Sequence, residues 1–446
     1  MATPTTGANL MATVDRPVVV VGAGVAGLVC ARALRAAGLP VLVLEAADAV
    51  GGRLRTTRHP DGYLLDRGFH LLPAAYPRLW DKVDAEAIGC RSFDPGTLVW
   101  TGRRLVPFTN PLAHPAGLLR DLTSPLFGTA DLSRLARLAA QAWRAPWETA
   151  REAADAMGPL AAIDLLWQEG FSRHFVDRFA RPVWGGALMF DPMLEGSAGS
   201  LLFSLNMLLA GRAVLPRDGT GAVGAALAAG LPSGTVRLGQ RVEAVVVEHG
   251  RAVGVRVGGE LLAASAVVVA TDPPAARRLT GIRALPDDAD GVASLTVFLG
   301  GERDPHLGRR LAADGTGRLT VNHVAPLSVV QPAYAPPARH LLAAVVVGDR
   351  LADADDATLA RRARADVARM VGHDEADWTI LRAIRVPFSR FRQPPAFGAT
   401  LPGNATDTDG LFLAGEATVD SSVNGAAASG ETAARLAVRR LTGGER

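Results

Sequence analysis

The sequence predicts an α/β fold with a parallel, Rossmann-like sheet, joined to a second domain of mixed sheet and helices. Residues 18–21 (VVVV) form an apolar, β-branched run that is typical of a buried parallel strand. Residues 22–27 (GAGVAG) follow directly and open a helix-forming segment that Gly38 closes. Residues 40–44 (PVLVL) predict a second buried strand, which ends on Glu45. Together these segments make a complete βαβ unit.

The glycine pattern of this unit predicts a dinucleotide site. Gly22 permits a tight turn, Gly24 lets a pyrophosphate approach the backbone, and Gly27 lets the helix pack closely on the strand. The helix N-terminus adds free N–H groups and a partial positive charge. Glu45, eighteen residues after Gly27, can accept both ribose hydroxyls of an adenosine, and its charge disfavours a 2′-phosphate.

The composition indicates a globular protein and excludes several other classes. The chain has 446 residues, 48% hydrophobic and 20% charged, with two cysteines, which excludes a disordered chain and a disulfide scaffold. The length suggests two or three domains. Of the 47 basic residues only Lys82 is a lysine, and no basic run accompanies the net charge of +3, so no nucleic-acid partner is expected.

The residues after Glu45 indicate which dinucleotide cofactor the site would bind. Gly51-Gly52-Arg53 resembles the continuation of the glycine motif in the flavin amine oxidase and phytoene desaturase superfamily. The resemblance implies FAD as cofactor, with the fold of the GR2 flavoproteins. It also implies that Arg53 meets the FAD phosphates, for which the planar guanidinium fork is suited. Residues 181–186 (RPVWGG) are similar to the phytoene-desaturase side of the superfamily.

Other segments extend the resemblance to the C-terminus. Residues 61–77 are similar to the stretch beside the isoalloxazine ring, and residues 411–416 (LFLAGE) to the C-terminal flavin motif, with Glu416 for a ribityl hydroxyl. Residues 424–426 start a helix whose N-terminus would face the flavin N1–C2=O edge. The cofactor-binding residues so implied are Gly22, Gly24, Gly27, Glu45, Gly52, Arg53, Gly68, Phe69, Val242 near the adenine, Thr271, Gly415, Glu416 and Val423.

Candidates for chemistry on the substrate are fewer. His70 follows Gly68-Phe69 and has an ordinary pKa near neutrality, so it can act as an acid or base, or else pack beside the ring or bond to the backbone. The residues expected to line a substrate cavity are Arg181, Trp184, Phe388 and Phe391. The histidines and cysteines lack ligand spacing, so no metal site is expected.

Departures from the superfamily shape the expected chemistry. The C-terminal half has no cysteine, so non-covalent FAD is expected. Residues 420–422 (DSS) supply no aromatic ring for the cage of monoamine oxidase-like members. The lysine that bridges to flavin N5 in many amine oxidases has no counterpart in the substrate domain, unless Lys82 reaches the flavin. Desaturase-like chemistry therefore fits better than amine oxidation.

The domains expected from these assignments are discontinuous. Residues 1–13 form a flexible tail, residues 14–80, 212–285 and 400–446 form the FAD domain, and residues 81–211 and 286–399 form the substrate domain. No secretory signal and no membrane span of ~18 apolar residues is found. The two cysteines, Cys30 and Cys90, are expected to be buried and reduced, in a reducing cytoplasm.

The function expected is FAD-dependent removal of hydride from a C–H bond of an apolar or amphipathic small molecule, such as an isoprenoid or secondary metabolite. Reduced flavin would return its electrons to O2 or another acceptor. An amine oxidase acting on C–N bonds, a redox-neutral flavin-dependent isomerase and a non-enzymatic FAD-binding protein remain alternatives. A lipid substrate would allow peripheral membrane contact through residues 111–147, and the oligomeric state stays open.

Overall fold

A computed structural model describes residues 16–109 and 124–443, which divide into two compact units. Unit 1 contains Met1–Gly52, Gly224–Asp287 and Leu401–Arg446, and unit 2 contains Arg53–Val223 and Asp288–Thr400. Residues 53–80 and 212–223, expected in the FAD domain, thus pack with unit 2. The expected tail, residues 1–13, lies outside the described residues.

Unit 1 is built on a five-stranded sheet in the order β10-β2-β1-β14-β20, in which every neighbouring pair is parallel. Its strands are β1 (Val18–Val21), β2 (Val41–Leu44), β10 (Val236–Arg237), β14 (Ala266–Val269) and β20 (Leu411–Leu413). Strands β1, β2, β14 and β20 are apolar and buried on both faces, as parallel strands covered by other elements must be. The predicted Rossmann-like sheet is confirmed.

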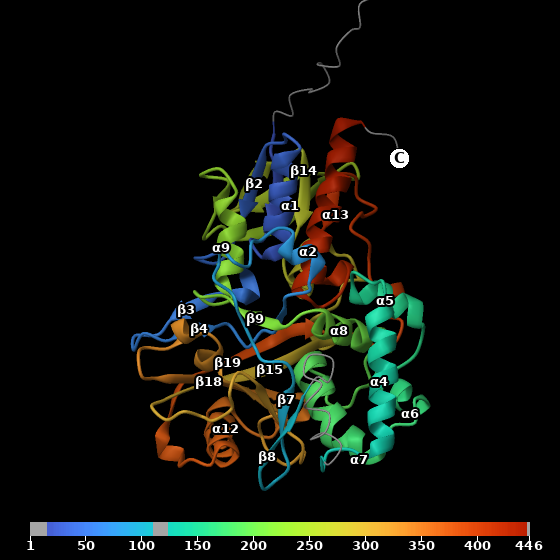
Figure 1. Cartoon of the computed structure of the whole chain (residues 1–446). Coiled ribbons are helices and arrows are strands. Elements are labelled where there is room, and N and C mark those ends of the chain that lie inside the picture. The colour runs from blue at the N-terminus through green and yellow to red at the C-terminus, as the bar shows by residue number, and fades with distance from the viewer. Residues whose placement is uncertain (1–15, 110–123, 444–446) are drawn as a thin grey trace, which may run out of the picture. The chain divides into compact units, whose positions relative to one another are not determined.

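Two helices of unit 1 lie against each other although they come from opposite ends of the chain. They are α1 (Val25–Ala36) and α13 (Val423–Thr442) (Figure 1). A Cβ atom on Gly430 would lie 2.3 Å from the Ala26 carbonyl oxygen, so only glycine allows this approach. The other elements of unit 1 are α9 (Gly221–Ala229, which begins in unit 2), α10 (Pro273–Thr280) and an antiparallel meander of β11 (Val242–Glu248), β12 (Arg251–Val257) and β13 (Glu260–Ala263).

Unit 2 contains a seven-stranded mixed sheet in the order β19-β15-β18-β17-β16-β7-β8. The strands are β7 (Thr97–Trp100), β8 (Leu105–Phe108), β15 (Gly291–Gly301), β16 (Leu311–Asp314), β17 (His323–Ala325), β18 (His340–Val347) and β19 (Trp378–Phe391). Only β16 and β7 pair in parallel within this sheet.

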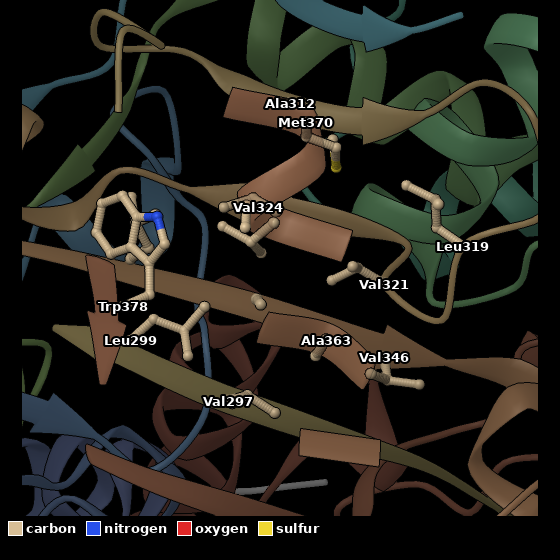
Figure 2. Packing of buried hydrophobic residues seen from close by; sticks show 14 of the residues in the cluster. Val297, Leu299, Ala312, Leu319, Val321, Val324, Val346, Ala363, Met370 and Trp378 are labelled. Carbon is tan, nitrogen blue, oxygen red and sulfur yellow. The ribbon is translucent and has the colours of Figure 1, made fainter. Parts of the chain in front are cut away.

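Each face of this sheet carries its own apolar core. Figure 2 shows one of them, in which Trp378, Leu299 and Val324 belong to the same cluster as Ala363 and Met370 of α12 (Asp356–Val371). Helix α12 begins after Asp355, whose carboxylate accepts a hydrogen bond from the Thr358 N–H at 2.9 Å. The opposite face contributes to a second core that includes Phe298 and Tyr334.

A helical subdomain completes unit 2, as expected for a domain of mixed sheet and helices. It contains α4 (Thr129–Arg144), α5 (Ala150–Met157), α6 (Ala162–Gln168), α7 (Arg173–Phe175), a π-helix (Val176–Met189) and α8 (Ala198–Ala210). The remaining short elements are β3 (Thr56–Arg58), β4 (Leu64–Asp66), β5 (Leu72–Pro73), α2 (Pro77–Trp80), β6 (Arg91–Ser92), β9 (Ala213–Leu215) and α11 (Leu327–Val330). Among the described helices, none has the length and apolarity to cross a bilayer.

Candidate functional site

The glycine turn of unit 1 has the geometry that a phosphate group needs. Gly22 has φ +107°, and a Cβ on Gly27 would lie 2.0 Å from the Gly22 carbonyl oxygen, so neither position accepts a side chain. A Cβ on Gly24, by contrast, would meet no atom within 4 Å. Helix α1 starts there without a side-chain cap or an acidic residue in its first turn. Its first N–H groups therefore have no capping side chain as acceptor and can receive an anion.

Glu45 follows β2 beside this turn. Its two carboxylate oxygens accept hydrogen bonds at 2.8 Å, one from the Ala23 N–H and the other from the Ala47 N–H. The backbone of Gln240 donates to the Glu45 carbonyl at 2.8 Å, which brings the start of β11 and the predicted adenine contact Val242 to the same strand end. The carboxylate is thus held in one orientation before any ribose arrives. These two N–H donors were not predicted from the sequence.

The Gly51-Gly52 segment returns to the glycine turn. The Gly51 N–H donates to the Ala23 carbonyl at 2.8 Å, and a Cβ on Gly52 would lie 3.4 Å from the Gly24 Cα. Gly52 also has φ +57°, in the left-handed region that favours glycine. The two predicted glycine motifs therefore form one surface of backbone atoms.

The later motifs of unit 1 meet the first one at the carboxyl ends of the strands. Val21 is in register with Leu44 and Val269, so the residues that follow them lie at one edge of the sheet. A Cβ on Gly22 would contact the Thr271 nitrogen at 3.4 Å, and one on Gly415 would contact the Thr271 carbonyl oxygen at 3.6 Å. Ligands of open parallel sheets bind at such an edge.

The N-terminus of α13 reaches the same motif. Helix α13 begins at Val423, where the Ser422 hydroxyl accepts from the Gly425 N–H at 2.8 Å. Further along the helix, the Ser429 hydroxyl accepts from the Gly415 N–H at 2.8 Å and so ties α13 to the C-terminal motif. Glu416 is buried, with 4% of its surface exposed. Ser429 was not predicted from the sequence. A serine that follows Asn424-Gly425 within a helix of small residues could have indicated a contact with the C-terminal motif.

The predicted flavin-side residues of unit 2 form a second group. Gly68 has φ +109°, and the N–H of Phe69 donates to the Thr296 hydroxyl at 3.2 Å. Nε2 of His70 lies 3.0 Å from the Arg53 carbonyl oxygen, while Nη1 of Arg53 donates to the Ser389 carbonyl at 2.8 Å. Residues 53 and 68–70 and the end of β19 are therefore brought together within unit 2.

The environment of His70 sets its protonation. A carbonyl only accepts, so Nε2 carries the hydrogen and Nδ1 keeps its lone pair. Burial, together with a smaller effect of the Arg53 guanidinium, lowers the pKa of His70 to about 4, although the hydrogen bond to the Arg53 carbonyl raises it. The ring is therefore neutral at pH 7 and suited to accept a proton rather than donate one. A catalytic role for His70 remains a prediction.

Acidification is expected to destabilise the apo protein through His70. The unfolded chain takes up a proton near pH 6.5, but the folded chain does so only near pH 4, so this contribution to stability is complete above pH 6.5 and is lost as the pH falls to 4. At 1.36 kcal/mol per pKa unit the loss reaches about 3 kcal/mol. Urea unfolding of wild type and His70→Gln at pH 7, 6 and 5 measures it. Parallel pH dependence in the two proteins would contradict the assignment.

The predicted cavity residues lie on two elements of unit 2. Arg181 pairs with Asp177 at 3.5 Å on the π-helix. Trp184, 5% exposed, packs in an aromatic core with ring centroids 5.5 Å from those of Phe175 and Phe179.

The other two predicted residues lie on β19. Phe388 lies against Gly291, where a Cβ would approach its ring to 2.6 Å. Phe391 is buried and packs on Phe397 with their centroids 6.1 Å apart. That these four residues line a substrate cavity remains a prediction.

A buried carboxylate that was not predicted from the sequence joins three segments of unit 2 by hydrogen bonds. Asp66, 3% exposed, accepts hydrogen bonds from the Thr56 hydroxyl at 2.5 Å, the Thr220 N–H at 3.0 Å and the Tyr334 hydroxyl at 2.8 Å. Burial raises the pKa of Asp66, and the three donors lower it. The network ties the hairpin before Phe69 to the chain around Thr220 and to the segment between β17 and β18. In the described part of the chain no group of three His, Cys, Asp or Glu residues could hold a metal ion.

Comparisons with known proteins bear on the family and the fold of the chain. A family model described as flavin containing amine oxidoreductase matches residues 25–438. The hydroxysqualene dehydroxylase of Rhodopseudomonas palustris is 28% identical over 466 aligned residues, covering 95% of this chain and 98% of that protein. The 15-cis-phytoene desaturase of Arabidopsis thaliana is 42% identical over 62 residues, 14% of this chain and 11% of that protein.

The fold is shared with solved structures. An oxidoreductase from Methanosarcina mazei superposes with a TM-score of 0.71 at 20% identity, over 93% of this chain and 99% of that one. A putrescine oxidase gives a TM-score of 0.70 at 19% identity, over 94% and 98% of the two chains. With a family model that spans nearly the whole sequence, the chain belongs to the flavin-containing amine oxidoreductases, a family of FAD-dependent oxidoreductases.

Proposed function

We propose that this FAD-dependent oxidoreductase acts at a carbon centre of an apolar, isoprenoid-like small molecule. The observation that carries the proposal is the similarity to a hydroxysqualene dehydroxylase along 95% of the chain. The sequence supports it, because residues 420–422 hold no aromatic ring and Lys82 is the only lysine. Amine oxidation is therefore the weaker alternative.

The residues around the glycine turn fit FAD. The open space at Gly24, the uncapped start of α1 and the oriented Glu45 carboxylate would hold the pyrophosphate and the adenosine ribose. Thr271, Gly415, Glu416 and the start of α13 at Val423 lie at the same sheet edge or on the segments that leave it. We propose that Arg53, Gly68 and Phe69 serve the flavin end. When bound, FAD supplies the capacity to take up or give back a hydride, that is, two electrons with one proton.

Cofactor attachment is proposed to be non-covalent. The two cysteines are Cys30, which is buried, and Cys90, which is half-buried, and both are free thiols. Acid precipitation is expected to release all of the flavin into the supernatant. Two free thiols also suit a reducing compartment, and we propose the cytoplasm.

Two further proposals concern partners. Reduced flavin would be reoxidised by O2 or another acceptor. Peripheral membrane contact, which a lipid substrate would allow, was predicted for residues 111–147, of which residues 111–123 lie outside the described part of the chain. In the described part, Trp143 on α4 leaves 56% of its surface exposed.

The direction of electron flow distinguishes two versions of the proposal. Hydride removal from a C–H bond reduces the flavin. The name of the Rhodopseudomonas relative instead denotes loss of a hydroxyl group, and replacing C–OH by C–H consumes two electrons and two protons and releases water. The similarity to that relative makes dehydroxylation the second candidate for this chain.

One anaerobic experiment tests the proposed function. The purified protein is expected to show a flavin spectrum that bleaches with an isoprenoid hydrocarbon if C–H bonds are oxidised. Photoreduced protein is expected to regain its oxidised spectrum with an isoprenoid alcohol if the reaction is dehydroxylation. Porphyrinogens are tested in the same panel. Turnover without bleaching would indicate an isomerase, and rapid bleaching by putrescine or another primary amine would overturn the proposal. Absence of flavin after purification would favour a non-enzymatic role.

A further inference from the structure

His323 is a fully buried histidine that no sequence motif marks. It opens β17, which lies between β18 and β16 in the seven-stranded sheet of unit 2, and its exposure is 0%. Nε2 of its ring has no hydrogen-bond partner. An unsatisfied buried acceptor costs about 1–3 kcal/mol, so native proteins keep few of them.

The other ring nitrogen is fixed by the neighbouring side chain. Nδ1 of His323 lies 2.9 Å from Oδ1 of Asn322. An amide oxygen only accepts, so Nδ1 carries the hydrogen and Nε2 holds a free lone pair. A Cβ on Gly186 would lie 2.0 Å from the Asn322 amide nitrogen, so the π-helix admits this side chain only because residue 186 is glycine. The tautomer of His323 is therefore set by packing.

The surroundings of the ring are apolar and belong to the predicted flavin side. Its centroid lies 5.6 Å from that of Phe69 and 6.4 Å from that of Phe190, which follows the π-helix with φ +54°. Phe69 is a predicted flavin contact and directly precedes His70. Burial lowers the pKa of His323 to about 3, so the ring stays neutral at physiological pH.

We propose that Nε2 of His323 accepts a hydrogen bond from a hydroxyl group of the substrate and so determines specificity for an alcohol over the matching hydrocarbon. The inference rests on the proposed isoprenoid-like substrate. A neutral O–H donor fits better than an ammonium group, because burying a cation beside a neutral imidazole and two phenylalanine rings carries a far larger desolvation cost. A site built to bind a hydroxyl discriminates strongly against an analogue that lacks it.

Equilibrium binding to the FAD-loaded protein tests the assignment. Farnesol and the hydrocarbon in which hydrogen replaces its hydroxyl are titrated anaerobically, with the perturbation of the flavin absorption spectrum as readout. Wild type is expected to bind the alcohol at least tenfold more tightly, and His323→Phe is expected to bind the two ligands equally. His373→Phe is the matched control, since His373 is a half-buried histidine of unit 2 that stacks on Trp378, and it is expected to keep the wild-type ratio.

A second measurement needs no substitution at the site. In wild-type protein labelled with ¹⁵N-histidine, the Nε2 resonance of His323 is expected to shift with farnesol and to stay in place with the hydrocarbon.

Two substitutions next to His323 test how its tautomer is fixed. Asn322→Asp keeps an acceptor for Nδ1 and is expected to preserve the preference for the alcohol, whereas Gly186→Ala displaces Asn322 and is expected to reduce that preference. Equal binding of both ligands to wild type, or an unmoved Nε2 resonance, overturns the role of His323 alone. Failure of both ligands to bind overturns the proposed substrate class, and the inference with it.

Discussion

Gly27→Ala is expected to destabilise unit 1 by about 3 kcal/mol and to abolish FAD retention. The added Cβ would lie 2.0 Å from the Gly22 carbonyl oxygen, so either α1 or the turn must move. Because the same turn is proposed to hold the pyrophosphate, the movement also removes the cofactor site. Urea unfolding of the apo protein and the flavin content after purification measure the two effects.

Gly24→Ala is the matched control and separates stability from binding. Its Cβ meets no protein atom within 4 Å and its φ is −76°, so the unfolding free energy of the apo protein should stay the same or rise by about 0.5 kcal/mol. The FAD dissociation constant should nevertheless increase at least tenfold if the pyrophosphate occupies that space. Unchanged FAD affinity in Gly24→Ala would remove the glycine turn from the proposed site.

Asp66→Ala is expected to lower the stability of unit 2 by about 3–5 kcal/mol. The substitution leaves the Tyr334 hydroxyl, the Thr220 N–H and the Thr56 hydroxyl without their common acceptor, and each unsatisfied donor costs about 1–3 kcal/mol, part of which is recovered when hydroxyl groups find new partners. Chemical denaturation followed by tryptophan fluorescence reports the change.

Two further variants test whether the buried hydrogen bonds cause this loss of stability. Asp66→Asn keeps one acceptor oxygen and can donate to the Tyr334 hydroxyl oxygen, so it should lose less than Asp66→Ala. Asp61→Ala removes an exposed carboxylate from the same hairpin, where Oδ2 of Asp61 lies 3.6 Å from Nδ1 of His59. This substitution should lower the free energy of unfolding by less than about 0.5 kcal/mol. Similar losses in Asp66→Ala and Asp61→Ala would show that the buried network does not stabilise the unit.

The cofactor side of the fold was predictable because its signals are local. A buried strand, a glycine turn, a helix and an acidic strand end occupy fewer than thirty consecutive residues, and each predicts the next. The structure places Gly22, Thr271 and Gly415 at one sheet edge because Val21, Val269 and the last residue of β20 are in register. Motifs that directly follow parallel strands come together once the strand order is known, because the carboxyl ends of these strands lie at one edge of the sheet.

The substrate side was less predictable because its contacts join distant segments. Trp184 has the same helical spacing whether it faces a cavity or packs against Phe175, and the sequence does not separate the two. Nothing local marks His323, since its isolation depends on Gly186, more than a hundred residues earlier, and on two phenylalanine rings from other segments. The role of Asp66 likewise depends on Thr220 and Tyr334, which are distant from it in the sequence.

The strand order of unit 1 has a consequence for synthesis on the ribosome. Strand β14 stays without its outer neighbour until β20 emerges, about 140 residues after β14 itself. At roughly 5–20 residues per second this interval lasts on the order of 7–28 s, during which β14 presents an unpaired apolar edge. A nascent chain stalled before residue 411 is therefore a natural client for chaperones, and truncation of the last 40 residues should give an aggregating polypeptide rather than a smaller enzyme.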